Sequence, residues 1–375
     1  MRKKILFLIH DLGPGGAEKV LVNLVNHMDR KKFDITVMTL FDVGVNRQFL
    51  NPAITYKACY AKAVPGNSKL MKVQSPEKLH KRLIKEHYDI EVSYLEGPSA
   101  RIISGCTDSG TKLVCWIHSE QYSKDLLAAS FRSFDEAVRC YDRFHKIIAV
   151  SGNVRHAFLA VSGCKTESAI LYNTNDSDKI LRLAQEPLTD GRFAADAFNI
   201  IAVGKLAKVK AYDRLIRIVR RLTDEGKAVH VYIAGEGPER EKLLSCAREN
   251  GVQERFTLCG YQTNPYKYIA NADLFVCSSL TEGFSTAAAE ALITGTPVCT
   301  VEVPGMKEML GENNEYGIVT ENTEEALYQG IRSLIDDPDL LAHYKEKAAE
   351  RGRAFRTEKT VRAVEEMFMH LSEES

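Results

Sequence analysis

Short apolar runs alternate with segments of helical pattern along this chain, and this alternating series occurs twice. The apolar runs of the first part are residues 5–9, 35–40, 90–95, 113–117 and 146–150, and those of the second part are 199–203, 229–234, 256–259, 274–277 and 297–301. Strands separated by helices are typical of a parallel sheet covered on both faces. Because one sheet with this many strands would exceed the usual limit of roughly ten, we expect two doubly wound α/β sheets.

The break between the two sets falls near residues 177–198, where Pro187, Gly191 and mixed charge indicate a connection. At 375 residues the chain also exceeds the usual size of a single core. We therefore expect an N-terminal domain over residues 1–175, a connection over 176–198 and a C-terminal domain over 199–350. Ligands of such sheets bind beyond the carboxyl ends of the strands, so two sheets facing each other would enclose a cleft.

The net charge of zero conceals an uneven distribution. Residues 1–170 hold 25 lysines and arginines against 17 acidic residues, and the rest of the chain holds 25 against 33. Eight basic side chains gather within residues 57–86, namely Lys57, Lys62, Lys69, Lys72, Lys78, Lys81, Arg82 and Lys85. Such a cluster attracts anionic surfaces, a membrane leaflet among them, although a solvated helix face is an equal alternative. A nucleic-acid partner is not expected.

Cysteine usage and the N-terminus indicate a cytoplasmic protein. The nine cysteines are scattered between Cys59 and Cys299 with no C-x-x-C pair, as expected of reduced thiols. The apolar run 5–9 behind Arg2, Lys3 and Lys4 is too short for a signal peptide, so we interpret it as a first strand. No run approaches the roughly 20 apolar residues of a membrane-spanning helix, so any membrane contact would be peripheral.

The stretch 278–292 carries the clearest functional pattern. It follows the strand 274–277, contains Glu282-Gly283-Phe284, and passes into a helix for which Ser285 or Thr286 is a plausible N-cap. The free N–H groups of a helix start attract anions. Glu282 in the loop and Glu290 about one turn into the helix are acceptors suited to the hydroxyls of a sugar or ribose. A ligand with both phosphates and hydroxyls is a nucleotide sugar.

Other strand ends carry weaker signals. Lys205 and Lys210 follow the strand 199–203 and are candidates to neutralise a pyrophosphate, although most exposed lysines are merely solvated. Gly15 and Gly16 open a helix after the first strand and either let a ligand approach the backbone or form a plain turn, since Glu18 breaks the dinucleotide fingerprint.

Gly235, Gly237 and Tyr261 lie at two further strand ends, where a base could rest. His118 follows the strand 113–117, either to hydrogen-bond a sugar hydroxyl or as a histidine satisfied beside Trp116. No metal-ligand spacing stands out, so a metal-free site is expected.

Taken in order, these motifs resemble those of the retaining glycosyltransferases of family 4, whose GT-B fold has two Rossmann-like domains facing across a cleft. The resemblance is strongest over residues 199–320, and it rests on Gly204-Lys205-Leu206 with Lys210, on 234–238, on Gly260-Tyr261, on Glu282 and Glu290 as the E-x7-E pair, and on 295–298. In the N-terminal part, 15–18, His118, 150–151 and 172–176 also match.

The resemblance implies roles for these residues. Glu282 would contact donor sugar hydroxyls and Glu290 the ribose, with the amides of Gly283, Phe284 and Ser285 around sugar and diphosphate. Lys205 and Lys210 would hold the diphosphate, assisted by Gly16 from the other domain. It also implies that a C-terminal helix, residues 351–375, crosses back to the N-terminal, acceptor-binding domain. Two positions depart from the family pattern, because Lys205 replaces an arginine and Ala211 a glycine.

The function expected from the resemblance is transfer of a sugar, with retention, from a nucleotide diphosphate, expected to be UDP, to a hydroxyl of a glycan or lipid-linked glycan in bacterial surface polysaccharide synthesis. The departing phosphate would take the acceptor's proton, and no further cofactor is expected. The place of action would be the cytoplasm at the inner face of the membrane. A UDP-sugar 2-epimerase of the same fold and a non-catalytic nucleotide-sugar-binding subunit are the alternatives.

Overall fold

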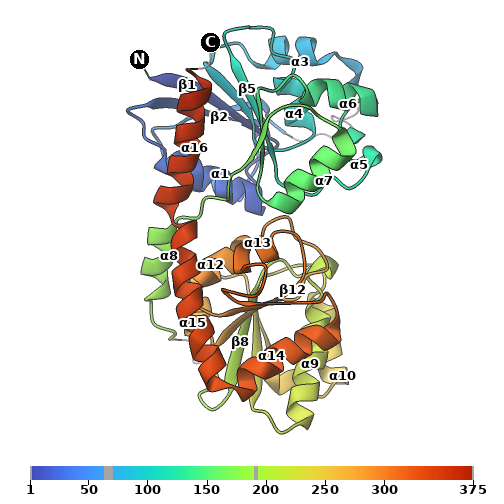
Figure 1. Cartoon of the computed structure of the whole chain (residues 1–375), viewed down its shortest axis with the longest axis vertical. Coiled ribbons are helices and arrows are strands. Elements are labelled where there is room, and N and C mark those ends of the chain that lie inside the picture. The colour runs from blue at the N-terminus through green and yellow to red at the C-terminus, as the bar shows by residue number, and fades with distance from the viewer. Residues whose placement is uncertain (1, 63–70, 190–192, 374–375) are drawn as a thin grey trace. The chain divides into compact units, whose positions relative to one another are not determined.

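The computed structural model describes residues 2–62, 71–189 and 193–373, and contacts divide the chain into two compact units. Unit 1 comprises residues 1–174 and 357–375, and unit 2 comprises residues 175–356. Each is built around one parallel β-sheet (Figure 1). The prediction of two doubly wound α/β domains is thus confirmed.

The sheet of unit 1 has the strand order β3-β2-β1-β4-β5-β6-β7. Its strands are β1 (Lys3–Ile9), β2 (Phe33–Phe41), β3 (Thr55–Tyr60), β4 (Ile90–Ser93), β5 (Lys112–Ile117), β6 (Lys146–Ala149) and β7 (Ser168–Ile170). The flanking helices are α1 (Gly16–His27), α3 (Pro76–Leu83), α4 (Pro98–Ile103), α5 (Lys124–Ala128), α6 (Phe134–Tyr141), α7 (Gly152–Ser162) and α16 (Thr357–Leu371), with the 3-10 turn η1 (Val45–Phe49). All neighbouring strands pair in parallel, so their carboxyl ends meet at one edge.

The sheet of unit 2 has the order β10-β9-β8-β11-β12-β13. Its strands are β8 (Phe198–Val203), β9 (Val229–Ala234), β10 (Phe256–Gly260), β11 (Leu274–Cys277), β12 (Val298–Val301) and β13 (Ile318–Thr320). The helices are α8 (Ser177–Ala184), α9 (Tyr212–Asp224), α10 (Arg240–Glu249), α11 (Tyr266–Asn271), α12 (Thr286–Thr294), α13 (Met306–Leu310), α14 (Glu324–Asp336) and α15 (Pro338–Gly352), with the 3-10 turns η2 (Lys208–Lys210), η3 (Gln253–Arg255) and η4 (Arg353–Phe355). These strands too are parallel, and β8 and β11 lie side by side at the point where the strand order reverses.

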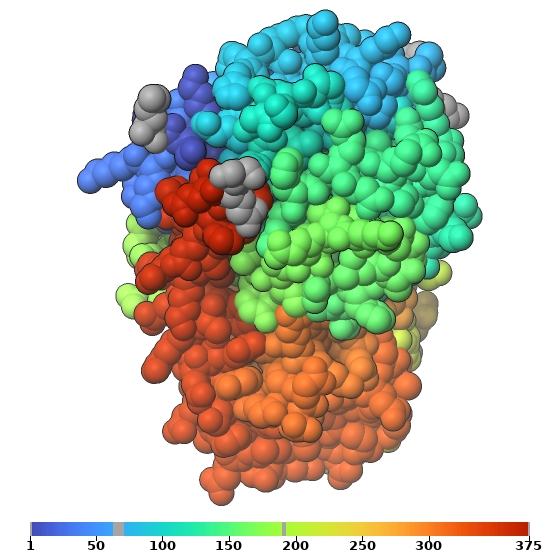
Figure 2. All heavy atoms as spheres, turned by 45° about the horizontal axis from the view of Figure 1, so that its top comes forward, coloured from blue at the N-terminus to red at the C-terminus, as the bar shows by residue number. Residues whose placement is uncertain are grey.

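Helix α16 belongs to unit 1 although it is separated from the rest of that unit by the whole of unit 2. The ring of Phe368 packs edge-on against those of Phe7, Phe33 and Trp116, at centroid distances of 5.9, 6.3 and 6.1 Å. The carboxylate of Glu365 accepts a hydrogen bond from the backbone N–H of Asp29 at 2.6 Å. The space-filling view shows α16 directly against the N-terminal residues of this unit (Figure 2). The helix therefore completes the core of the first sheet.

Two details differ from the sequence analysis. The stretch expected as a connection, residues 176–198, contains α8, which contacts α11 and α12 of unit 2. The C-terminal helix expected over residues 351–375 is shorter, because α15 continues to Gly352, η4 follows it, and α16 runs only from Thr357 to Leu371. Phe355 is fully buried in this break and its ring lies 5.9 Å from that of Phe284, which holds the turn in place. Within the described ranges, no helix is long and apolar enough to cross a membrane.

Candidate functional site

The start of helix α12 follows the carboxyl end of β11. Of the two plausible N-caps, the structure selects Ser285, whose hydroxyl accepts a hydrogen bond from the N–H of Ala288 at 3.3 Å. A capped start leaves the other first-turn N–H groups at the sheet edge, where they favour an anion. The sequence prediction of a strand, a glycine-containing loop and a helix start is confirmed.

The loops after β8 and β11 are hydrogen-bonded to each other. The N–H of Leu280 donates to the carbonyl of Val209 at 2.7 Å, and the hydroxyl of Ser278 donates to the carbonyl of Lys210 at 2.8 Å. Ala211, at the start of α9, adopts a left-handed conformation with φ 47°. An alanine here bears strain that a glycine would not, which accounts for the glycine expected at this position. The two loops form one support for the side chains above them.

Lys210, Glu282 and Ser279 form a compact polar group on this support. The ammonium of Lys210 donates to Oε1 of Glu282, and the hydroxyl of Ser279 donates to the same oxygen at 2.6 Å. The side chains of Lys210 and Glu282 are 24% and 14% exposed. In the part of the chain that the structure describes, no donor is bonded to the other oxygen of Glu282, Oε2. The carboxylate is thus held through one oxygen, while the second can accept a hydroxyl.

A small pocket beside this group is lined by Lys210, Tyr212, Ser279, Glu282 and Ser285, among others. The Tyr212 hydroxyl is buried, and among the described residues it has no hydrogen-bond partner. Burial raises the pKa of this phenol, so it stays protonated and can donate. A buried polar atom without a hydrogen-bond partner destabilises the folded protein, so a ligand atom that accepts a hydrogen bond from Tyr212 would bind more tightly.

Glu290 is the fifth residue of α12 and is buried, with 3% exposure. The Tyr266 hydroxyl lies 3.5 Å from its Oε1, at the limit of a hydrogen bond. Glu282 and Glu290 therefore have different surroundings. The first faces the strand-end pocket and the second lies inside the unit.

The predicted glycines after β9 have a packing role. A Cβ added at Gly235 would lie 1.9 Å from the carbonyl oxygen of Gly204, and one at Gly237 would lie 2.4 Å from that of Leu206. These glycines let the turn after β9 lie directly on the turn after β8, where the N–H of Leu206 donates to the carbonyl of Glu236 at 2.9 Å. The turn that carries Lys205 is fixed in this way.

The remaining predicted residues of unit 2 present different groups. Lys205 is exposed, and the structure records no side-chain partner for it among the described residues. Tyr261, beyond β10, is 71% exposed and open to stacking. The Phe284 side chain is buried, so this residue and Gly283 can offer a ligand only backbone groups.

In unit 1, Gly15 and Gly16 stand at the start of α1, with Gly15 as the N-cap residue. A Cβ at Gly15 would lie 2.1 Å from a carboxylate oxygen of Glu18, whereas one at Gly16 would meet nothing within 4 Å. The atoms near Gly15 belong to the end of a flexible side chain that can move aside, so packing requires neither glycine, and Gly16 leaves the helix start open. Burial raises the pKa of Glu18, which lies beside this turn.

His118 lies beyond β5 in the same unit. Its backbone N–H donates to Glu96 at 2.9 Å, and the hydroxyl of Ser119 also donates to that carboxylate. The ring lies 5.0 Å from that of Tyr94, and its Nε2 is buried without a partner among the described residues. Burial lowers the pKa of His118 to about 3, so the imidazole is neutral. Burial also raises the pKa of Glu96, against the hydrogen bonds that lower it.

The structure brings Lys210, Glu282 and Ser285 together within unit 2, and it places Gly15, Gly16 and His118 at the strand ends of unit 1. Sequence reasoning missed Ser279, Tyr212 and Glu96. Ser279 and Glu96 lie within three residues of the end of a strand, which is the signal that would have found them, whereas Tyr212 opens α9 and carries no such signal. Of the basic cluster, Lys57 pairs with Glu86, and Arg82 bonds Tyr60, while Lys69 lies outside the described residues.

Two family models match the chain in succession. Residues 14–179 match the model for Glycosyltransferase Family 4, and residues 189–351 match the model for Glycosyl transferases group 1.

A curated relative is similar over almost the whole chain. The N-acetylgalactosamine-N,N'-diacetylbacillosaminyl-diphospho-undecaprenol 4-alpha-N-acetylgalactosaminyltransferase of Campylobacter jejuni is 29% identical over 361 residues, which cover 94% of this chain and 96% of that protein.

Solved structures share the fold at lower identity. Alr3699/HepE from Anabaena, in complex with UDP, has a TM-score of 0.78 at 20% identity and covers 98% of this chain and 100% of that one. Sucrose-phosphate synthase from Thermosynechococcus elongatus has a TM-score of 0.79 at 17% identity, with full coverage of both chains.

Proposed function

Because this chain belongs to the glycosyltransferases of family 4, with the GT-B fold, we propose that it moves a sugar from a UDP-sugar to a hydroxyl of a lipid-linked glycan, with retention at the anomeric carbon. The product would enter a bacterial surface glycan. The observation that carries the proposal is the group of Lys210, Glu282 and the capped start of α12 at the carboxyl ends of β8 and β11.

The site offers what a nucleoside diphosphate sugar requires. The diphosphate would lie between the ammonium of Lys210 and the first-turn N–H groups behind Ser285, with Lys205 as a second cation. Glu282 would accept a sugar hydroxyl through Oε2 while Lys210 and Ser279 hold Oε1. Tyr212 would donate to a ligand oxygen. Glu290 would accept a ribose hydroxyl.

The lysines and the helix start would also carry the catalysis. When the sugar leaves, negative charge grows on the diphosphate, and donors already aimed at that position stabilise it without reorganisation. The departing phosphate would take the acceptor's proton, so we assign no general base and no further cofactor. His118, neutral and with Nε2 unpartnered among the described residues, is suited to hydrogen-bond a sugar hydroxyl rather than to transfer a proton at neutral pH.

The donor and acceptor classes rest on the relatives. A curated relative spanning nearly the whole chain is named for transfer to a diphospho-undecaprenol-linked sugar, which supports a lipid-linked acceptor. A solved structure of the same fold holds UDP, which supports a uridine nucleotide. A lipid-linked acceptor would place the enzyme at the inner face of the membrane, with the basic segment 57–86 toward the anionic lipid.

Binding of the donor is tested first by thermal unfolding against UDP-, GDP- and ADP-sugars. A ligand present at a hundred times its dissociation constant stabilises by about 2.7 kcal/mol, so a UDP-sugar should raise the melting temperature and the others should not. A larger shift with a GDP- or ADP-sugar would overturn the choice of UDP.

Transfer is tested with Glu282→Ala, and with Glu254→Ala as the matched control on an exposed residue of the same unit. Transfer to an undecaprenyl-diphosphate glycan should fall at least a hundredfold in the first variant and stay unchanged in the control. Equal activity in both variants would refute the site. The wild-type enzyme incubated with UDP-GlcNAc alone should not form UDP-ManNAc, because an epimerase makes that product without an acceptor.

A further inference from the structure

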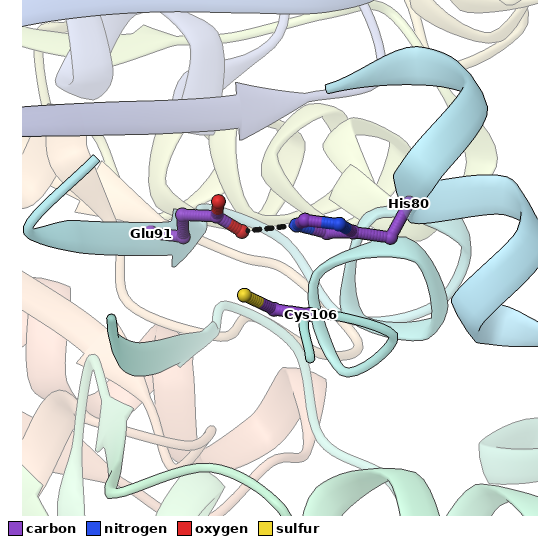
Figure 3. A group of neighbouring side chains, drawn as sticks. All are labelled: His80, Glu91 and Cys106. Carbon is purple, nitrogen blue, oxygen red and sulfur yellow. Dashed lines mark hydrogen bonds and ion pairs between the residues drawn. The ribbon is translucent and has the colours of Figure 1, made fainter. Parts of the chain in front are cut away.

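Three side chains that can bind a metal converge in unit 1, whereas the group of Lys210 and Glu282 belongs to unit 2. Figure 3 shows His80 of α3, Glu91 of β4 and Cys106 of the turn after α4 pointing toward one another. Their ligand atoms all lie within 4.8 Å of one another, and Nε2 of His80 is 2.7 Å from Oε2 of Glu91. The three residues come from three different elements, so the sheet and two helices together fix their positions.

The position of Glu91 is unusual for a carboxylate. It lies on β4 between β1 and β5, paired in register with Leu6 and Leu113, and is 2% exposed. Cys106 is also buried, with 4% exposure, and the side chain of His80 is 13% exposed. A buried charge is stable only when it is paired or coordinates a metal. His80 provides one partner, and the inward-pointing sulfur provides a third ligand that a simple ion pair does not need.

We propose that His80, Glu91 and Cys106 form a structural binding site for one zinc ion, with water as the fourth ligand. Zinc bonds to His nitrogen, carboxylate oxygen and Cys sulfur at about 2.0–2.3 Å, which sets the ligand atoms about 3.3–3.8 Å apart. Only small side-chain movements are needed from the observed positions. One thiolate and one imidazole favour zinc over magnesium or calcium, which prefer oxygen ligands.

Charge balance supports this assignment. His80 would bind zinc through a neutral imidazole nitrogen, Glu91 through a carboxylate and Cys106 through a thiolate, so the two negative charges of the ligands balance the two positive charges of Zn²⁺. Protons that these groups lose on binding the metal go to solvent, so the occupied site carries no buried net charge.

The site would act on stability rather than on transfer. Glu91 is the second residue of β4, whereas His118 and Glu96 follow the carboxyl ends of their strands. Zinc would instead fasten α3 to β4 and to the turn after α4. Residues 80, 91 and 106 belong to no short metal-binding motif, which is why a metal-free site was expected from the spacing alone. This inference does not depend on the donor or acceptor proposed above.

The first test is metal uptake by the full-length enzyme after removal of metals with EDTA. We expect one zinc per chain after gel filtration, and a rise in melting temperature of about 5–10 °C at free zinc a hundredfold above the dissociation constant. Cys106→Ser should lose the rise, whereas Cys140→Ser, which replaces an equally buried cysteine of the same unit, should keep it. No stoichiometric uptake, or an equal rise in both variants, would overturn the proposal.

A second test does not rely on the variants folding. Cobalt added to the metal-free wild-type enzyme should give the intense visible bands of a tetrahedral site and a thiolate-to-cobalt charge-transfer band. Zinc should then abolish both. A spectrum like that of cobalt in water would mean that His80 and Glu91 form only an ion pair beside an inert thiol. The metal-free enzyme should keep its donor-dependent activity at low temperature, because the site is structural.

Discussion

Replacing Lys210 with methionine removes one charge from the group of Lys210, Glu282 and Ser279 and keeps most of the side chain's volume. In the structure the ammonium donates to Oε1 of Glu282, which also accepts from Ser279. The variant would leave Glu282 with the hydrogen bond from Ser279 and the weak one from the Cys277 thiol at 3.9 Å. The variant therefore removes the positive charge beside the expected diphosphate and keeps the loop that carries Glu282 in place.

The size of the effect follows from the surroundings of the lysine. Two unit charges about 4 Å apart interact by about 4 kcal/mol at an effective dielectric constant of about 20. Lys210 is 24% exposed and shares its charge with Glu282, so part of this attraction is screened. We expect a loss of about 2–3 kcal/mol in UDP binding, which is roughly a 30- to 150-fold rise in the dissociation constant.

Titration calorimetry with UDP measures this change without knowledge of the acceptor. The matched control is Lys208→Met, in the same η2 turn but exposed, which should change the affinity by less than about twofold. Thermal unfolding of each variant checks its stability, because the loss of one hydrogen bond to the Glu282 carboxylate should lower the free energy of unfolding by about 1–3 kcal/mol. If Lys210→Met and Lys208→Met bind UDP equally well, the placement of the diphosphate beside Lys210 is wrong.

Three further sets of substitutions test the cap of α12, a buried ion pair of unit 1 and a buried histidine. Ser285→Ala should lower the free energy of unfolding by about 1 kcal/mol in a guanidinium titration, because the N-cap hydrogen bond to α12 is lost, and an unchanged midpoint would contradict that role. Arg101→Met should cost about 3–5 kcal/mol, because it removes the buried guanidinium that pairs with the Glu136 carboxylate at 2.9 and 3.2 Å and leaves that carboxylate the backbone N–H of Arg132 at 2.6 Å. Burial raises the pKa of Glu136, but the hydrogen bonds from Arg101 and Arg132 outweigh burial, so this pKa lies below its usual value in the folded protein. The stabilisation by the ion pair is therefore complete above about pH 4.5 and is lost as the pH falls through the lowered pKa. If the melting temperature of Glu136→Gln falls with acid as steeply as that of the wild type, this reasoning is wrong. The pKa of His118 in the folded protein is lowered to about 3, so below about pH 6.5 the imidazole is protonated in the unfolded chain but neutral in the folded one. Acid should therefore lower the melting temperature of the wild type more than that of His118→Asn between pH 7 and pH 4.

Much of the fold and part of the site could be predicted because their signals are local. Apolar runs of strand length followed by glycine and a helix start mark where a parallel strand ends, and such ends meet at one edge of a sheet. That rule placed Lys210 and the loop of Glu282 together, and the residue types at the helix start identified Ser285 as a candidate N-cap. The start of α12 is fixed by residues adjacent in sequence.

What the sequence did not reveal depends on contacts between distant residues. The break between α15 and α16 arises because Phe355 is buried near Phe284, and the helical pattern carries no trace of that contact. Tyr212 resembles an ordinary helix residue until the pocket beside it is seen. His80, Glu91 and Cys106 meet only after three elements pack. Periodicity describes one element at a time, so such meeting points stay hidden from it.

The return of α16 to unit 1 has a consequence for how the chain is made. Phe7 and Trp116 lie in early strands, yet the ring that covers both is Phe368. All of residues 175–356 must be synthesised in between, which takes roughly 10–40 s at ordinary ribosome speeds. During that interval the first sheet carries an uncovered apolar patch, and the second unit has all its residues once residue 356 is made, before α16 is complete. The order in which the two units mature would thus reverse their order in the gene, and the early strands would be the part of the nascent chain most dependent on chaperones.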